Sequence, residues 1–108
     1  MSALDPREGN LTVWITATRN DVVLSKAELE AFAAPFRRPE GPVIRVVVHE
    51  AVACISIRGD HFQRNAVLEH LGNAFYEANF KWIRTTGNFD WLRRQVKEAA
   101  RALAAATD

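Results

Sequence analysis

A chain of 108 residues that is 48% hydrophobic and 25% charged has the size and balance of one globular domain, which excludes a disordered chain. Fourteen basic against thirteen acidic residues leave a formal net charge of +1, which excludes a global field that attracts nucleic acid or anionic lipid. Any charged binding surface must therefore be local.

The first residues of the chain, 1–10, carry charges and lack the apolar run of a signal peptide. Nowhere does the chain hold ~18 uninterrupted apolar residues, the length of a membrane span. We expect a flexible segment over residues 1–10, a single α+β domain over 11–108 and a cytoplasmic location. Abundant arginine and alanine also fit a GC-rich bacterial genome.

The first strand is predicted over Leu11–Thr18, where apolar residues alternate with threonines and Trp14. Turn-forming residues follow, and Ser25 with Glu28 three residues later matches a capping box at a helix start. The helix ends in the proline-containing stretch Pro35–Pro39. Its apolar side consists of Leu29, Phe32, Ala33 and Phe36.

Two β-branched runs, Val43–His49 and Val52–Arg58, are separated by Glu50 and Ala51 alone and predict an antiparallel hairpin. That turn lacks glycine and asparagine, so its type and register stay open. Cys54 is the only cysteine, and its apolar neighbours favour a small buried side chain over a reactive thiol.

A second helix is predicted to begin at the N-cap residue Asp60 and to stop at Gly72 and Asn73. Residues 74–86 fit a strand or a continued helix, and we favour the strand because of that stop signal. The last helix is predicted over Asn88–Ala106, with the apolar stripe Phe89, Leu92, Val96, Ala99, Ala100 and Leu103.

This order of elements predicts a ferredoxin-like βαββαβ sandwich with an additional C-terminal amphipathic helix. The first two helices would cover one face of the sheet. Alternation predicts that the side chains pointing toward them are Val13, Ile15, Val46, Val48, Ile55 and Ile57. Trp14, Arg45, Ser56 and Arg58 would then point to the opposite face, which either the last helix or a second copy of the chain would cover.

Motifs of enzyme chemistry are missing from the sequence. His49, His61 and His70 have no compact metal-ligand spacing, and no phosphate loop or nucleophile elbow occurs. We therefore expect no catalytic residue, no metal and no cofactor.

The leading hypothesis is a non-enzymatic protein–protein interaction module that docks on another protein or on a second copy of itself, as in a bacterial signalling or defence assembly. Aromatic residues and arginine are the types that anchor interfaces. The expected interaction surface consists of Trp14, Arg45, Arg58, Lys81, Trp91 and Arg94. Two other classes stay open: binding of RNA or single-stranded DNA by the open sheet face, and a small-ligand sensor or compact enzyme.

Overall fold

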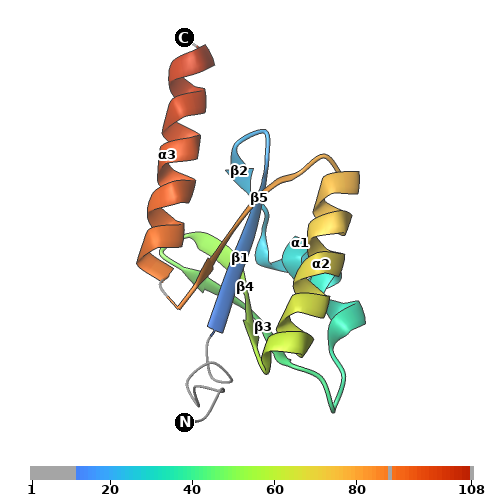
Figure 1. The fold of residues 1–108 in the computed structure, drawn as a ribbon. Helices are drawn as coiled ribbons and strands as arrows, with labels where there is room; N and C mark the ends of the chain where they lie inside the picture. Colours follow the sequence, from blue (N-terminus) through green and yellow to red (C-terminus); the bar gives the residue numbers. More distant parts are fainter. Residues whose placement is uncertain (1–11, 88, 108) are drawn as a thin grey trace.

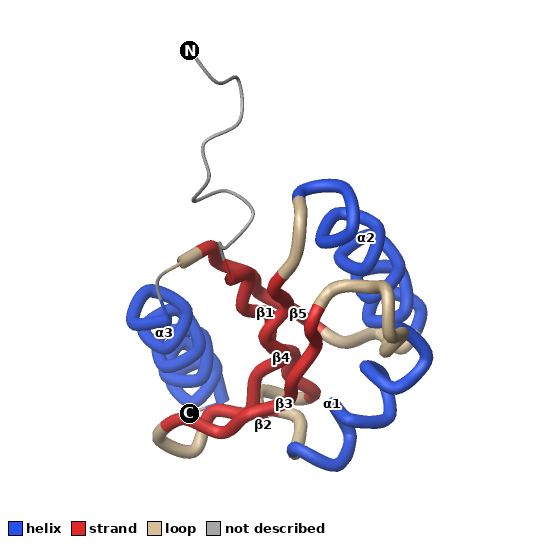
Figure 2. The backbone as a smooth tube through the Cα atoms, turned by 90° about the horizontal axis from the view of Figure 1, so that it is seen from below, coloured by secondary structure: helices blue, strands red, loops and turns tan. Residues whose placement is uncertain are grey.

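An antiparallel sheet stands between two layers of helices in the computed structural model, with α1 and α2 on one face and α3 on the other (Figures 1 and 2). We call these the inner and the outer face. The structure describes residues 12–87 and 89–107, so the expected flexible segment 1–10 lies outside the described residues. The strands are β1 (Thr12–Arg19), β2 (Val22–Val23), β3 (Val43–His49), β4 (Val52–Arg58) and β5 (Lys81–Thr86). The helices are α1 (Lys26–Ala33), a 3-10 turn (Ala34–Phe36), α2 (His61–Glu77) and α3 (Phe89–Thr107).

The sheet is built around β1, which pairs antiparallel with β4 on one side and with β5 on the other. β3 lies outside β4 and pairs with it antiparallel over their whole length. β2 forms a short hairpin with the end of β1 and was not expected from the sequence. The α+β class with an antiparallel sheet and three helices is confirmed.

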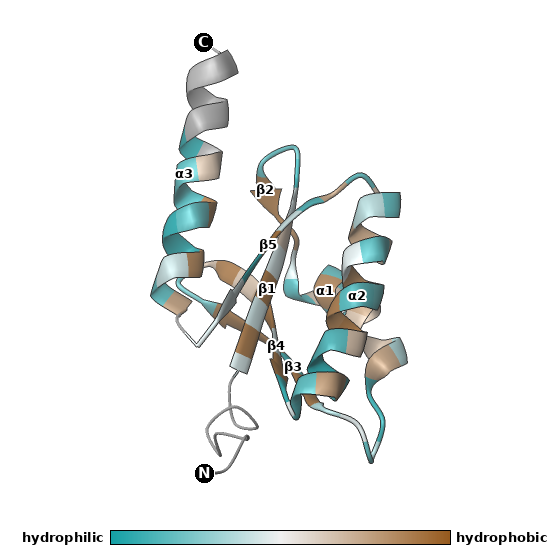
Figure 3. Ribbon diagram, viewed as in Figure 1, coloured by the Kyte–Doolittle hydropathy of each residue, from teal (hydrophilic) through white to brown (hydrophobic). Residues whose placement is uncertain are grey.

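The main core fills the space between the inner face and helices α1 and α2. Five of the six side chains expected to point inward are buried in it: Val13, Ile15, Val46, Ile55 and Ile57. The sixth, Val48, is 53% exposed and lies near the hairpin end of β3, the edge strand of the sheet. Figure 3 shows hydrophobic stretches in the strands and in α1, and mostly hydrophilic ones along the coloured part of α3.

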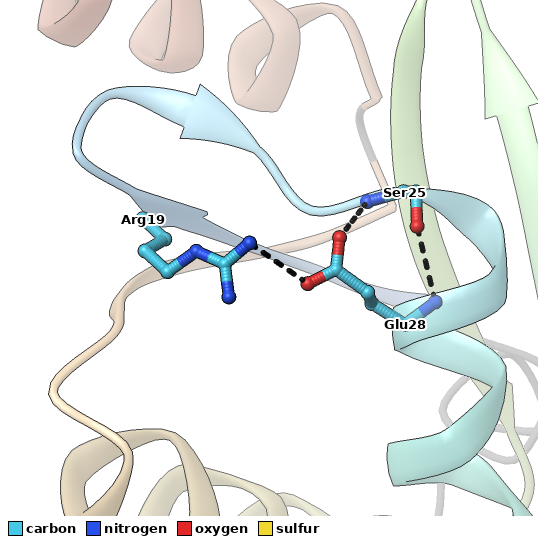
Figure 4. A network of polar contacts seen from close by, with 3 residues as sticks. All are labelled: Arg19, Ser25 and Glu28. Carbon is cyan, nitrogen blue, oxygen red and sulfur yellow. Dashed lines mark hydrogen bonds and ion pairs between the residues drawn. The ribbon is translucent and has the colours of Figure 1, made fainter.

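The start of α1 has the predicted capping box (Figure 4). The Glu28 amide donates to Ser25 Oγ, and the Ser25 amide donates to Glu28 Oε1, each at 3.2 Å. Hydrogen bonds from the Ser25 backbone and side chain, together with the Arg19 guanidinium 3.5 Å from Glu28 Oε2, hold the pKa of the Glu28 carboxyl below its usual value. The local prediction is accurate because both partners lie within one turn of the chain.

The end of α2 differs from the prediction. The helix passes through Gly72 to Glu77, so the expected stop at Gly72 is wrong, and the strand expected over residues 74–86 is present only over Lys81–Thr86. A Cβ on Gly72 would lie 2.9 Å from Cζ2 of Trp82, so this glycine allows the indole to pack against the helix. The stop is at Asn79, which has a φ of 60° and donates its amide hydrogen to the Tyr76 carbonyl at 3.0 Å.

The turn between β3 and β4 has two residues, and both adopt a left-handed conformation, with φ of 48° at Glu50 and 71° at Ala51. This pattern is typical of a type I′ turn, which prefers asparagine and glycine at these positions. Left-handed backbone is costly for alanine because its Cβ approaches the following carbonyl oxygen. The turn is therefore locally unfavourable, and the pairing of the two strands holds it in place.

Ala51→Gly is expected to raise the free energy of unfolding by about 0.5–1 kcal/mol, since relief at the left-handed position outweighs the extra entropy of the unfolded chain. Urea unfolding followed by circular dichroism would measure the change. The matched control is Ala31→Gly at an exposed position in α1, which should lower stability by about 1 kcal/mol. If both variants changed the free energy of unfolding in the same direction, the left-handed geometry of the turn would be contradicted.

Candidate functional site

Helix α3 covers much of the outer sheet face through a small second core. The buried members of this core are Val52, Cys54, Leu92 and Val96, and the partly buried residues packed on it are Trp14, Val23, Ile83 and Phe89. The predicted apolar stripe of α3 thus faces its own sheet at Phe89, Leu92 and Val96. Arg93 on the same helix pairs with Glu50 in the β3–β4 turn and with Asp90, which ties α3 to the hairpin.

The Trp14 side chain is held in place by two aromatic neighbours. Its ring centroid lies 5.6 Å from that of His49 and 5.3 Å from that of Phe89, both in edge-on geometry. Such pairs contribute about 0.5–1.5 kcal/mol beyond the area that they bury. Phe89 at the start of α3 thus contacts Trp14, whereas Trp91 on the same helix is 41% exposed.

A hollow of about 530 Å³ lies on the outer face, beside Trp14. It is lined by Thr12, Trp14, Val43, Arg45, Ser56, Arg58 and Gly59, and we call it the outer-face groove. Strand register explains the set, because cross-strand neighbours share a sheet face. Ser56 pairs with both Trp14 and Arg45, while Arg58 pairs with both Thr12 and Val43.

The charge of the groove comes from Arg45 and Arg58, both exposed. Because Arg58 is opposite Val43 rather than Arg45, the two arginines are diagonal neighbours, roughly 7–8 Å apart at Cα. Arg45 has no ion pair among the residues that the structure describes. Two cations this close repel each other, so an anionic group between them is favoured electrostatically.

Cys54, in the small core beneath α3, is poorly reactive. Burial raises the pKa of the Cys54 thiol to about 12, although a hydrogen bond with Thr16 opposes the rise. The thiolate is the reactive form, so the expected burial of Cys54 is confirmed and a nucleophilic role is disfavoured. Thr16 itself is buried, and its Oγ1 donates to the Ala53 carbonyl at 2.6 Å where β4 diverges from β1.

The other three residues of the expected interaction surface lie outside the groove. Lys81 is exposed at the start of β5, where it pairs with Thr18 at the opposite end of β1 from the groove. Trp91 and Arg94 are exposed on α3. The structure therefore brings Trp14, Arg45 and Arg58 together and does not add the remaining three to them.

The three histidines lie in separate places. His49 packs on Trp14 and Phe89, His61 contacts Asn65 at 3.2 Å, and His70 stacks on Phe36 with centroids 5.9 Å apart. Within the described part of the chain, no group of three or more His, Cys, Asp or Glu side chains is arranged to hold a metal ion. Asp60, before His61, accepts the Gln63 amide hydrogen at 2.8 Å and caps α2, as predicted.

Ser56 was expected on this sheet face and lies in the groove, whereas Val43 and Thr12 belong to the groove but were not singled out from the sequence. The alternation of side chains and the hairpin register together predict their position, because each residue lies directly across from a residue that was named. His49 and Phe89 were likewise missed as the partners that fix Trp14.

The described residues define the class as an α+β protein with an antiparallel sheet, helices on both faces and a cationic groove on the outer one. In comparisons with known proteins, no family, curated protein or solved structure matches the chain. None of the helices described has both the length and the hydropathy needed to cross a lipid bilayer.

Proposed function

We propose that this protein is a non-enzymatic protein–protein interaction module whose outer-face groove binds an acidic segment of another protein. The observation that carries the proposal is the meeting of Trp14, Arg45 and Arg58 in one groove beside the exposed Val43. Arginine beside an aromatic and an aliphatic side chain is a combination typical of interface anchors. The ligand that fits carries one or two carboxylates next to an apolar side chain.

A protein ligand is favoured over RNA by the state of Trp14. Single-stranded nucleic acid binds to open sheets by stacking bases on free aromatic faces. Trp14 is partly buried and sits against His49 and Phe89, so little of its ring is available to a base. α3 also packs over much of the face that such a ligand would need.

The proposal includes three finer statements. The first is a ferredoxin-like sheet with β2 as an addition, which is supported by the places of β4 and β5 on either side of β1 and of β3 outside β4. The second is a reducing bacterial cytoplasm, supported by the single buried Cys54 and by the arginine- and alanine-rich composition. The third is a role as the docking domain of a larger signalling or defence assembly.

A random peptide-display selection against the purified protein tests the proposed function. Enriched peptides are expected to combine Asp or Glu with a hydrophobic residue. Isothermal titration with the best peptide should show that Arg45→Glu and Arg58→Glu each weaken binding by about tenfold or more, the effect of losing a charge-assisted hydrogen bond. Binding should also weaken as salt rises from about 0.05 to 0.5 M, because screening shortens the range of the attraction.

The matched control is Arg38→Glu, an exposed arginine outside the outer-face groove, which should leave peptide affinity unchanged. A selection that enriches no acidic peptide, or binding that ignores both groove variants, would overturn the proposal. So would tighter binding of a single-stranded RNA oligonucleotide, with the steep salt dependence of several phosphate contacts, since that result favours a nucleic-acid function.

A further inference from the structure

Strand β3 forms one edge of the sheet, with β4 on one side and no paired strand on the other among the described residues. Its sequence from Val43 to His49 is rich in valine, and Arg45 is its one permanently charged residue. An exposed edge of this kind presents a row of backbone groups that pair readily with another strand. The opposite edge strand, β5, carries exposed Lys81 and Arg84, which protect an edge.

The pairing register shows which backbone groups of β3 point outward. His49 and Val52 flank the two-residue turn, so they exchange both hydrogen bonds, and every second residue counted back from His49 also bonds to β4. The N–H and C=O groups of Ile44, Val46 and Val48 therefore point away from the sheet.

One outward group of β3 already has a partner in its own chain. Arg37 Nε donates to the Ile44 carbonyl at 3.3 Å, which agrees with the outward direction of that oxygen. For Val46 and Val48, the part of the chain that is described supplies no backbone partner on this side. The available stretch of the edge is therefore short and runs from Val46 to Val48, and the Val48 side chain beside it is 53% exposed.

We propose that two copies of the chain pair antiparallel through their β3 strands, with a two-fold axis at Val47. In this register Val46 of each copy faces Val48 of the other, and the two residues exchange hydrogen bonds in both directions. The Val48 side chain, now in solvent, is then covered by the second copy. The pairing joins two sheets into one continuous sheet.

Two observations select this register over its neighbours. Centring the axis on Val46 would pair Ile44 with Val48 and require the Ile44 carbonyl that Arg37 occupies. Centring it on Arg45 would place two guanidinium groups directly opposite each other, which is unfavourable. The axis at Val47 instead sets Arg45 opposite His49 of the second copy and brings the acidic Glu50 of that copy beside Ile44.

This inference is independent of the proposed function, because it concerns the backbone edge of β3 and needs no ligand in the outer-face groove. Light scattering coupled to size exclusion, at protein concentrations up to about 1 mM, is the test. The wild-type protein is expected to have twice the mass of one chain. Val48→Pro, which removes an outward N–H but none of the bonds to β4, is expected to have the mass of one chain.

A second variant keeps the test decisive if the proline disturbs the strand. Val48→Lys places a charge on the edge and should also give a monomer with an unchanged circular dichroism spectrum. Its matched control is Val22→Lys, an exposed valine on β2 away from this edge, which should remain dimeric. A wild-type monomer at every concentration, or a dimer that persists in Val48→Lys, overturns the proposal.

Amide hydrogen exchange tests the same β3 pairing one hydrogen bond at a time. In the dimer, the amides of Val46 and Val48 should be protected and should lose protection on dilution, whereas the Val47 amide, bonded to β4, should not. Equal behaviour of the three amides under dilution would contradict the β3 pairing.

Discussion

Phe75→Ala is expected to lower the free energy of unfolding by about 3–5 kcal/mol, the range for removing a fully buried phenylalanine. Phe75 has no exposed surface and is the largest of the fully buried side chains. Its ring lies 4.9 Å from that of Phe32 in α1, 6.4 Å from that of Trp82 in β5 and 6.5 Å from that of Phe80. The substitution therefore opens a cavity where α1, α2 and β5 meet.

A loss of that size is a large part of the roughly 5–15 kcal/mol that stabilises an ordinary domain. Urea unfolding followed by tryptophan fluorescence would measure it. Tyr76→Ala is the matched control, because Tyr76 is the next residue of α2 and is 81% exposed, so its change should stay within about 0.5 kcal/mol. Similar losses for the two variants would mean that α2 does not pack as described.

The parts of the fold that the sequence predicts well are those set by neighbouring residues. Ser25 and Glu28 close a capping box within one turn, and Asp60 caps α2 by the same local chemistry. The β3–β4 hairpin follows from two β-branched runs, although the left-handed conformation of Glu50 and Ala51 was not foreseen. That conformation depends on strand pairing, which compensates for unfavourable turn residues.

The error at Gly72 shows where local signals fail. Glycine ends many helices, but it also sits inside a helix wherever a neighbour must approach closely. At Gly72 the neighbour is Trp82, ten residues later, and its identity emerges only when β5 folds back along α2. β2 was missed for a different reason, because Val22 and Val23 are too few to show a strand period.

The candidate groove was partly predictable. Alternation along β1, β3 and β4 correctly grouped Trp14, Arg45 and Arg58 on one sheet face. The sequence did not say how far α3 would reach across that face, since an apolar helix stripe packs equally well on its own sheet or on another copy. The observed contacts of Leu92 and Val96 with Val52 and Cys54 decide this point.

Leu92→Asp is expected to release α3 from the outer face while the main core stays folded. Leu92 is fully buried, and removing such a leucine already costs about 2–5 kcal/mol before a carboxylate is placed in the cavity. The main core under α1 and α2 contains neither Leu92 nor Val96, so the substitution should destabilise the packing of α3 and not the main core. The strand amides of β1 and β4 should therefore keep their protection against hydrogen exchange.

The release of α3 has a chemical readout in Cys54, which α3 covers. In the wild type the thiol keeps its proton up to a pKa of about 12, compared with 9.0 when unperturbed, so it should react slowly with a disulfide reagent at about pH 8. Because the folded pKa is raised, this group's contribution to stability is complete below pH 9 and is lost as the pH rises towards 12. Leu92→Asp should return the pKa toward 9 and accelerate labelling by at least about tenfold, the effect of weakening local protection by about 1.4 kcal/mol.

Arg94→Asp places the same carboxylate on the exposed side of α3 and should leave the labelling rate of Cys54 unchanged. An equal labelling rate in Leu92→Asp and the wild type would show that α3 does not shield the Cys54 thiol. The burial of Cys54 would then have to come from a segment other than α3. Fast labelling that is confined to Leu92→Asp, with β1 and β4 still protected, is the result that the packing of Leu92 on Val52 and Cys54 requires.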